Sequence, residues 1–341
     1  MRTLRSIEAL VVIPGLALWL TGCGGQQSPL NPNGIEAEHL ARLFWFFTAA
    51  CAAVWGLVLI GLLAALYASR RRNDPISDPL MLDANRERRM IYVVASLVGL
   101  TTIILIVFTF SSYLATKTLA ASGEALKIEV TGYQWWWNVN YENPEPSQIF
   151  ATANELHVPV GQPVKIDLKA ADVIHSFWVP NLTGKQDLIP GQENVVSFTA
   201  QRVGTYRGQC AEFCGWQHAH MAFFVVAEQP TAFAAWRANQ LAASTQPADE
   251  EAKLGKQIFL TRGCALCHTI RGTNAGGKSG PDLTHVASRL TLAAGTLPNS
   301  RGKLVEWIAD PQKFKPGNKM PKVPLTQMEL DALGVYLWKQ K

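Results

Sequence analysis

The chain has 341 residues, which is enough for two or three domains. Hydrophobic residues make up 48% of it and charged residues only 17%, which argues against a wholly soluble protein and indicates membrane segments joined to globular parts. The net charge of +5 is unevenly distributed, so as a total it indicates no particular partner. We expect no nucleic-acid partner.

Six cysteines are present, and an even number in an exported protein can indicate disulfides. Four of them, however, form two close pairs beside histidines, which is the spacing of metal and haem sites. We therefore expect metal or haem binding rather than disulfides at these four positions.

The N-terminus is typical of a secretory signal, with two arginines followed by an apolar run over residues 7–20. The run leads into Leu-Thr-Gly-Cys23, which resembles a bacterial lipobox. This implies cleavage of residues 1–22 as a lipoprotein signal peptide and lipidation of the Cys23 sulfur. The alternative is an uncleaved signal with a chance cysteine. Residues 23–38 would form an extracytoplasmic segment.

Two further apolar stretches, residues 40–68 and 90–116, are long enough to cross a bilayer as helices, which takes about 20 residues. Six arginines lie in the loop between them, within residues 69–89. By the positive-inside rule this loop is cytoplasmic. We therefore expect a transmembrane hairpin over residues 39–118 in a bacterial plasma membrane, with both termini and both soluble domains extracytoplasmic.

Residues 119–230 change to short strands, with examples at 127–131, 164–168, 195–198 and 222–227. The alternation of apolar and polar residues and the Gly/Pro turns predict an antiparallel, all-β sandwich. The end of this region carries a loop rich in metal-binding side chains.

Soft metal ligands are concentrated in this loop: Cys210 and Cys214 lie four residues apart, His218 four further on and Met221 three beyond that. Thiolate, imidazole and thioether ligands select copper over hard cations. Zinc is the main alternative, because two cysteines and two histidines also form structural zinc sites, but zinc has no use for the methionine. A second histidine, His175, lies between two predicted strands.

The loop resembles the dinuclear CuA loop of cytochrome c oxidase subunit II. Three upstream segments resemble the same family: GYQWWW at 132–137, DVIHS at 172–176 and DLIPG at 187–191. With the helical hairpin, the resemblance covers roughly residues 35–230 and implies a cupredoxin-like fold. Quinol oxidase subunits share this fold but lack the copper ligands, so they are excluded.

The resemblance implies a role for each position of the copper motif. Cys210 and Cys214 would bridge two copper ions, His175 and His218 would each bind one of them, and Met221 and the backbone carbonyl of Glu212 would be weak ligands. The Glu212 carboxylate would face a magnesium ion at the boundary with the catalytic subunit. His220 is expected to point elsewhere, and His157 and His39 are expected to be structural or surface residues.

Three consecutive tryptophans, residues 135–137, cannot all face one side of a strand, so we expect at least one to be exposed. The resemblance implies that Trp135 is the point at which electrons reach CuA. Its two neighbours are expected to pack in the core.

A linker over residues 231–250, which begins with a short helical stretch, leads to a last domain at 251–341. Cys264-Ala-Leu-Cys267-His268 is the signature of covalent haem c attachment, in which both thiols add to the haem vinyl groups and the histidine coordinates iron. The domain resembles an all-α class I cytochrome c.

The sixth iron ligand is expected downstream of this signature, since Met/His ligation raises the haem potential. Met320 lies in a GNKMP segment that resembles the methionine loop of class I cytochromes c, and it is the favoured ligand. Met328 is interpreted as a core residue of an amphipathic final helix, and His285 as a weaker competitor. Pro281 lies in a segment resembling the loop whose proline carbonyl accepts the other N–H of His268.

Charge differs between the two soluble domains. Residues 251–341 hold 14 Lys/Arg and 6 Asp/Glu, whereas residues 120–230 hold 6 and 11. We expect the basic haem domain to dock on the acidic copper domain of its own chain.

The predicted architecture is a multi-domain membrane protein with a two-helix transmembrane hairpin, an all-β cupredoxin-like sandwich and an all-α cytochrome c domain. The resemblance implies subunit II of a caa-type cytochrome c oxidase. Electrons would pass from an external donor, such as a cytochrome c or a quinol-oxidising complex, to haem c, then to CuA and then to the haem–copper subunit I, where oxygen is reduced to water.

Subunit III is a further expected partner, and the complex would also pump protons, with Glu87 as a candidate for proton uptake. One alternative is the CuA subunit of a nitric oxide reductase. Another is a copper chaperone or sensor, against which the complete ligand set argues.

Overall fold

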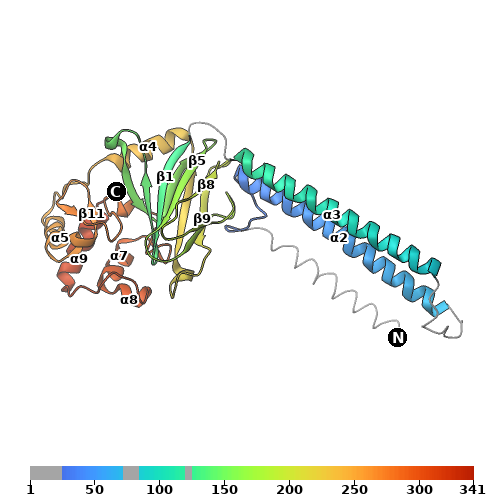
Figure 1. The fold of residues 1–341 in the computed structure, drawn as a ribbon. Helices are drawn as coiled ribbons and strands as arrows, with labels where there is room; N and C mark the ends of the chain where they lie inside the picture. Colours follow the sequence, from blue (N-terminus) through green and yellow to red (C-terminus); the bar gives the residue numbers. More distant parts are fainter. Residues whose placement is uncertain (1–24, 72–83, 120–124) are drawn as a thin grey trace, which may run out of the picture. The chain divides into compact units, whose positions relative to one another are not determined.

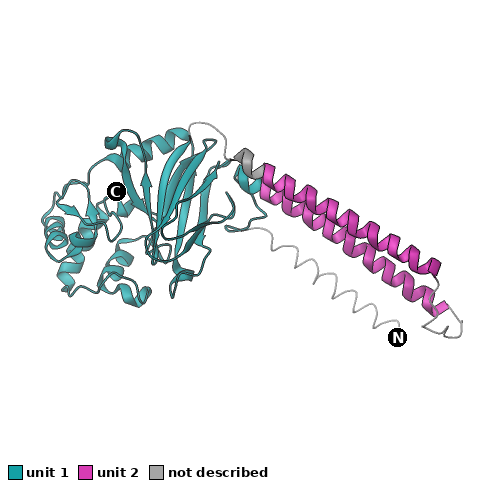
Figure 2. Ribbon diagram, in the orientation of Figure 1, with its two compact units in different colours: residues 1–38, 122–341 teal, residues 39–121 magenta. Residues whose placement is uncertain are grey.

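The computed structural model describes residues 25–71, 84–119 and 125–341. The predicted signal peptide, the lipidation site Cys23 and most of the predicted cytoplasmic loop lie outside these residues. The chain divides into two compact units, residues 1–38 with 122–341 and residues 39–121 (Figure 2).

The smaller unit contains most of α2 (Ile35–Arg71) together with α3 (Ala84–Leu119). Each helix contains a stretch long and apolar enough to cross a membrane. The side chains of Phe46 and Phe47 contact the ring of Phe108, with ring centroids 4.8 and 5.7 Å apart. Hydroxyl groups along these stretches donate to the carbonyl four residues earlier, which satisfies them without water. They belong to Thr48, Thr101, Thr102 and Thr109.

The larger unit begins with a sandwich of two five-stranded sheets (Figure 1). The first sheet has the order β3-β2-β1-β5-β8, with β1 Leu126–Tyr133, β2 Trp136–Tyr141, β3 Phe150–Ala153, β5 Val164–Ala170 and β8 Asn194–Phe198. The second has the order β4-β10-β9-β6-β7, with β4 Glu155–Pro159, β6 His175–Trp178, β7 Gln186–Leu188, β9 Gly204–Cys210 and β10 Ala222–Glu228. The predicted β-sandwich is confirmed.

Both sheets are mixed, so the prediction of a purely antiparallel sandwich is wrong. β1 pairs with β5 in parallel, with Ile128 opposite Ile166, and β10 pairs with β4 in parallel, with Phe224 opposite Glu155. Parallel neighbours need a long crossover, and here β2, β3 and β4 lie between β1 and β5 in the chain. Apolar alternation within a strand carries no information about the direction of its partner.

The core lies between the two sheets and is built from alternate residues of each strand. Trp137, Phe177 and Phe223 are fully buried and contact one another, with centroids 4.6–6.3 Å apart. The first turn of α2 is tied to this sandwich, because the Glu36 carboxylate accepts the Thr199 N–H at 2.8 Å. The aromatic cluster lies beside the copper motif, because the Trp137 ring contacts that of His175 and Phe177 pairs with Cys210.

A helical domain follows the sandwich and confirms the predicted cytochrome c-like part. The helix α4 (Pro230–Leu241) comes first and packs on the sandwich core through Phe233 and Trp236. The helices of the domain itself are α5 Glu250–Thr261, α6 Cys264–Cys267, α7 Arg301–Ala309, α8 Pro311–Phe314 and α9 Gln327–Trp338. Thr326 and Glu329 form a reciprocal capping box at the start of α9, which satisfies two otherwise free N–H groups. α5 and α9 cross closely at Gly255, where a Cβ would lie 2.1 Å from the Ala332 carbonyl oxygen.

Candidate copper and haem sites

The predicted copper ligands come from three neighbouring parts of the second sheet. Cys210 ends β9, and Met221 immediately precedes β10. The Cys210 N–H donates to the Met221 carbonyl at 3.0 Å, which closes the loop carrying Cys214 and His218. His175 begins β6, the strand that pairs with β9.

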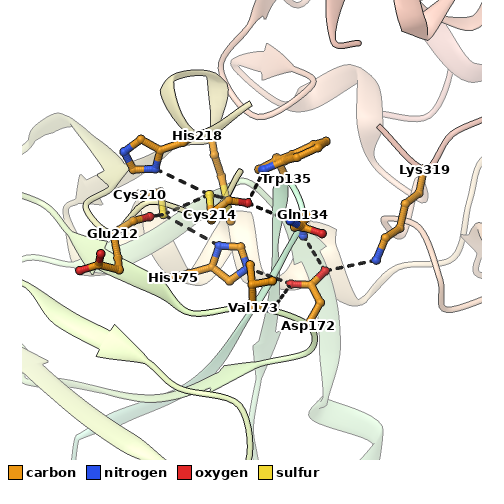
Figure 3. A network of polar contacts seen from close by, with 11 residues as sticks. Gln134, Trp135, Asp172, Val173, His175, Cys210, Glu212, Cys214, His218 and Lys319 are labelled. Carbon is orange, nitrogen blue, oxygen red and sulfur yellow. Dashed lines mark hydrogen bonds and ion pairs between the residues drawn. The ribbon is translucent and has the colours of Figure 1, made fainter. Parts of the chain in front are cut away.

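All six predicted positions meet at one place, and Figure 3 labels five of them, all except Met221. The Sγ atoms of Cys210 and Cys214 are 3.8 Å apart, Cys210 Sγ lies 3.9 Å from His175 Nδ1 and 3.2 Å from the Glu212 carbonyl oxygen, and Cys214 Sγ lies 3.6 Å from His218 Nδ1 and 3.8 Å from Met221 Sδ. Ligands of a shared ion lie about 3–4 Å apart, since each is about 2.0–2.3 Å from a metal such as zinc. Each sulfur faces one imidazole, so the donors fit two ions bridged by the two sulfurs.

Four of the six donor residues are buried and oriented by their neighbours, whereas Glu212 and His218 are half-buried. Cys210, Cys214, Met221 and His175 are each at most 3% exposed. The Nε2 atom of His175 lies 3.0 Å from Asp172 Oδ1, which fixes the ring with Nδ1 toward the sulfur. The contact with Cys214 lowers the pKa of the Cys210 thiol, and the same contact raises the pKa of Cys214 because a second negative charge would form beside the first.

Trp135 contacts the copper loop directly but is not exposed. Its indole N–H donates to the Cys214 carbonyl at 2.9 Å, as does the side-chain amide of Gln134. Trp135 is 8% exposed, Trp137 is fully buried and Trp136 is half-buried, stacked on Tyr133. The expectation that one of the three is exposed is therefore wrong. The reason is that the helical domain covers Trp135.

The other histidines of the sandwich have partners elsewhere. His220 is exposed, and its Nδ1 atom lies 2.9 Å from Gln217 Oε1. The ring of His157 is buried between two carboxylates, 3.0 Å from Glu155 and 3.2 Å from Glu228. His157 thus has the contacts of a structural residue.

The haem signature occupies a short helix. Cys264 and Cys267 are the end residues of α6, and His268 follows. The Nδ1 atom of His268 lies 2.8 Å from the Pro281 carbonyl, which leaves Nε2 available for iron. Burial lowers the pKa of His268, which favours the neutral, metal-binding form. A Cβ at Gly280 would lie 2.7 Å from the His268 ring, so this close approach requires glycine.

Met320 and its rivals lie in different surroundings. Met320 is half-buried in the loop between α8 and α9, where its N–H bonds Asn318 Oδ1 at 2.9 Å. Met328 is 73% exposed, so its interpretation as a core residue is wrong: the buried side chains of α9 begin at Leu330. Both ring nitrogens of His285 face backbone carbonyls, at 2.8 and 3.2 Å, which leaves neither for iron.

The helical domain contacts the sandwich through two loops. Residues 315–319 lie on Trp135 and Asp172: Lys315 Nζ donates to the Trp135 carbonyl at 2.7 Å, and Lys319 Nζ lies 3.2 Å from Asp172 Oδ2. Figure 3 shows Lys319 reaching toward Asp172. In the second loop, Ala294 and Leu290 bond sandwich residues. Lys315 could not be recognised from the sequence, because a lysine between Phe and Pro carries no signal of burial.

Comparison with known proteins agrees with this arrangement. Residues 144–228 match the family described as cytochrome c oxidase subunit II, periplasmic domain, and residues 252–341 match cytochrome c. Cytochrome c oxidase subunit 2 of Alkalihalophilus pseudofirmus is 31% identical over 344 residues, covering 99% of this chain and 98% of that protein. That of Bacillus subtilis is 29% identical over 355 residues, covering 98% and 96%.

The chain belongs to the cytochrome c oxidase subunit 2 family. It is a copper-binding subunit II fused to a cytochrome c domain and is part of a haem–copper oxidase. The two matched families imply copper in the sandwich and haem in the helical domain, where the donor sets described above fit them.

Proposed function

We propose that this chain takes electrons from an external donor at its haem c and passes them through a dinuclear CuA centre to subunit I, where oxygen is reduced to water. Haem iron and bridged copper both supply reversible one-electron chemistry when bound. The donor would be a cytochrome c or a quinol-oxidising complex, and subunit III would complete the partners.

The observation that carries this proposal is the contact between the methionine loop and the copper loop. The loop bearing Met320 lies against Trp135, whose indole N–H bonds the Cys214 carbonyl at 2.9 Å. A second chain of contacts runs from Lys319 through Asp172 to His175, with steps of 3.2 and 3.0 Å. Both connect the loop of a proposed haem ligand to a proposed copper ligand.

The chain's own residues would hold both groups. Cys264 and Cys267 would bind the haem covalently, and His268 and Met320 would bind its iron. His175, Cys210, Glu212, Cys214, His218 and Met221 would hold the two copper ions, while the Glu212 carboxylate, one oxygen of which lies 4.0 Å from Lys185 Nζ, would take magnesium at the contact with subunit I. Buried donors in a fixed loop keep the rearrangement on electron transfer small, which suits a carrier.

The membrane arrangement is a further part of the proposal. The two apolar helices would cross a bacterial plasma membrane with both soluble domains outside, and Cys23 would carry a lipid. Glu87, in the first turn of α3, would assist proton uptake in a proton-pumping complex. Intact-mass measurement tests the lipid: a mass increase of diacylglycerol size on Cys23 is expected, and an unmodified Met1 terminus would contradict it.

The function is tested on the purified complex with reduced cytochrome c. We expect oxygen uptake, together with the optical spectrum of a covalent haem c that stays with this chain on denaturing gels. Nitric oxide reduction without oxygen uptake would overturn the proposal in favour of a nitric oxide reductase.

A further inference from the structure

A buried lysine lies where the cytochrome c domain meets the copper domain. Lys315 is only 3% exposed, and its amine donates to the carbonyls of Trp135 at 2.7 Å and Ala293 at 3.1 Å. Among the residues that the structure describes, no carboxylate lies within ion-pair distance of it. Burial of an amine without a counter-charge costs desolvation free energy. The two hydrogen bonds have to offset this cost.

The amine joins three segments that are distant in sequence. One carbonyl belongs to the copper domain at Trp135, the other to the 290–295 loop of the cytochrome c domain, and the lysine itself starts the methionine loop. The next two residues add to the same contact. Gln217 donates to the Pro316 carbonyl at 2.9 Å, and a Cβ at Gly317 would lie 3.6 Å from the Trp135 ring.

We infer that Lys315 is a positioning residue, whose amine fastens the methionine loop to the Trp135 backbone and so sets the path from haem to copper. This inference rests on the proposed function. It has a second consequence: the same contact covers Trp135, so an external protein donor has to deliver its electrons to the cytochrome c domain and not directly to copper.

The kinetic test uses the complete oxidase carrying Lys315→Met, with Lys313→Met as matched control, because Lys313 is exposed and its amine contacts no copper-domain residue that the structure describes. Haem is reduced by a light pulse and copper reduction is followed in time. We expect Lys315→Met to slow haem-to-copper transfer about tenfold, the population effect of losing its one hydrogen bond to the copper domain. Reduction of haem by the external donor should be unchanged, and Lys313→Met should match wild type. Equal transfer rates in all three proteins would overturn the inference.

Amine labelling of the wild-type complex tests the same contact without mutation, so it still decides if Lys315→Met fails to assemble. With an acylating reagent and mass spectrometry, we expect Lys315 to react at least about tenfold more slowly than Lys313, because the reagent must wait for the domains to separate. Equal labelling would overturn the inference. A complex that labels as expected but consumes no oxygen would instead contradict the proposed function.

Discussion

Met320 and Met328 lie eight residues apart and are the two methionines of the cytochrome c domain. Met320 is half-buried in a loop held by Asn318 and Gln312, whereas Met328 projects into solvent from the first turn of α9. A ligand needs a fixed backbone, and only Met320 has one that is fastened by side chains on both its N–H and its carbonyl.

We expect Met320→Ala to lower the reduction potential of the haem, since a thioether axial ligand raises it. The fall should be on the order of 0.1 V, within the range of about 0.8 V that axial ligands span. Redox titration followed by haem absorbance measures it, with Met328→Ala as the matched control. A shift caused by Met328→Ala and not by Met320→Ala would contradict the assignment.

Some properties of single residues can be predicted from the sequence and others cannot. The six proposed copper ligands could be named because they match the positions of a known motif, and the structure brings all six together. The exposure of Trp135 and Met328 could not be predicted, because it depends on which other parts of the chain pack against each side chain. The cytochrome c domain covers Trp135, whereas Met328 is left exposed. In the sequence Lys315 cannot be told from a surface lysine, and only the structure shows the two carbonyls to which its amine donates.

The helices of the cytochrome c domain depend on the close crossing of α5 and α9. At Gly255 a Cβ would lie 2.1 Å from the Ala332 carbonyl oxygen and 2.7 Å from Tyr336 Cβ, and the nearest of these atoms is backbone. Gly302, in α7, has no atom within 4 Å of the equivalent position. The two glycines are thus a matched pair, one required by packing and one not.

We expect Gly255→Ala to destabilise the cytochrome c domain by about 1–3 kcal/mol through overpacking. Gly302→Ala should leave the domain unchanged or stabilise it by up to about 1 kcal/mol, from helix propensity alone. Denaturant unfolding followed by haem absorbance measures both free energies. Equal midpoints for the two variants would show that α5 and α9 do not cross at Gly255.

Elements were predicted better than their pairing. The predicted strand at 164–168 lies within β5, and that at 222–227 within β10, because alternation and turn residues are local signals. The parallel pairing of β1 with β5 depends on a crossover through three other strands, which no local pattern encodes. The capping box before α9 is local, and its Thr-x-x-Glu spacing is visible in the sequence.

The whole molecule holds a basic domain against an acidic one, yet few charges meet at the contact. Lys319 and Asp172 form an ion pair there, and Lys319 remains 68% exposed. The hydrogen bonds across the contact are donated by Lys315, Gln217 and two backbone N–H groups, and of the accepting oxygens only that of Glu155 is charged. Net charge therefore favours encounter of the domains, while hydrogen bonds fix the final position.

The rate of electron transfer from haem to copper should consequently depend on ionic strength, but only weakly. One exposed ion pair contributes about 0.2–1 kcal/mol, so we expect the rate to fall no more than about fivefold between low ionic strength and 1 M, where the Debye length is about 3 Å. Flash-induced transfer at several salt concentrations measures this. Lys319→Met should remove most of the dependence, and a rate indifferent to salt in the wild type would contradict a role for the pair.

The buried amine of Lys315 makes the docking of the two domains depend on pH. Burial lowers the pKa of Lys315 to about 7, against an ordinary value of 10.5, although the nearby Cys214 sulfur opposes the shift. The undocked chain, with the amine in water, therefore binds more protons than the docked chain between these two values. Docking becomes more favourable as the pH rises through this window and is least favourable below it.

We expect the urea concentration that abolishes haem-to-copper transfer to increase as the pH rises from 7 toward 10.5. The free energy of docking should change by at most about 1.4 kcal/mol per pH unit. The neutral amine still has two N–H groups, one for each carbonyl, so deprotonation removes the charge without removing either bond. Lys315→Met lacks the titrating group, and subtracting its pH profile removes the contribution of every other ionisable side chain. A difference profile that is flat, or that falls with rising pH, would show that Lys315 is not buried in the docked molecule.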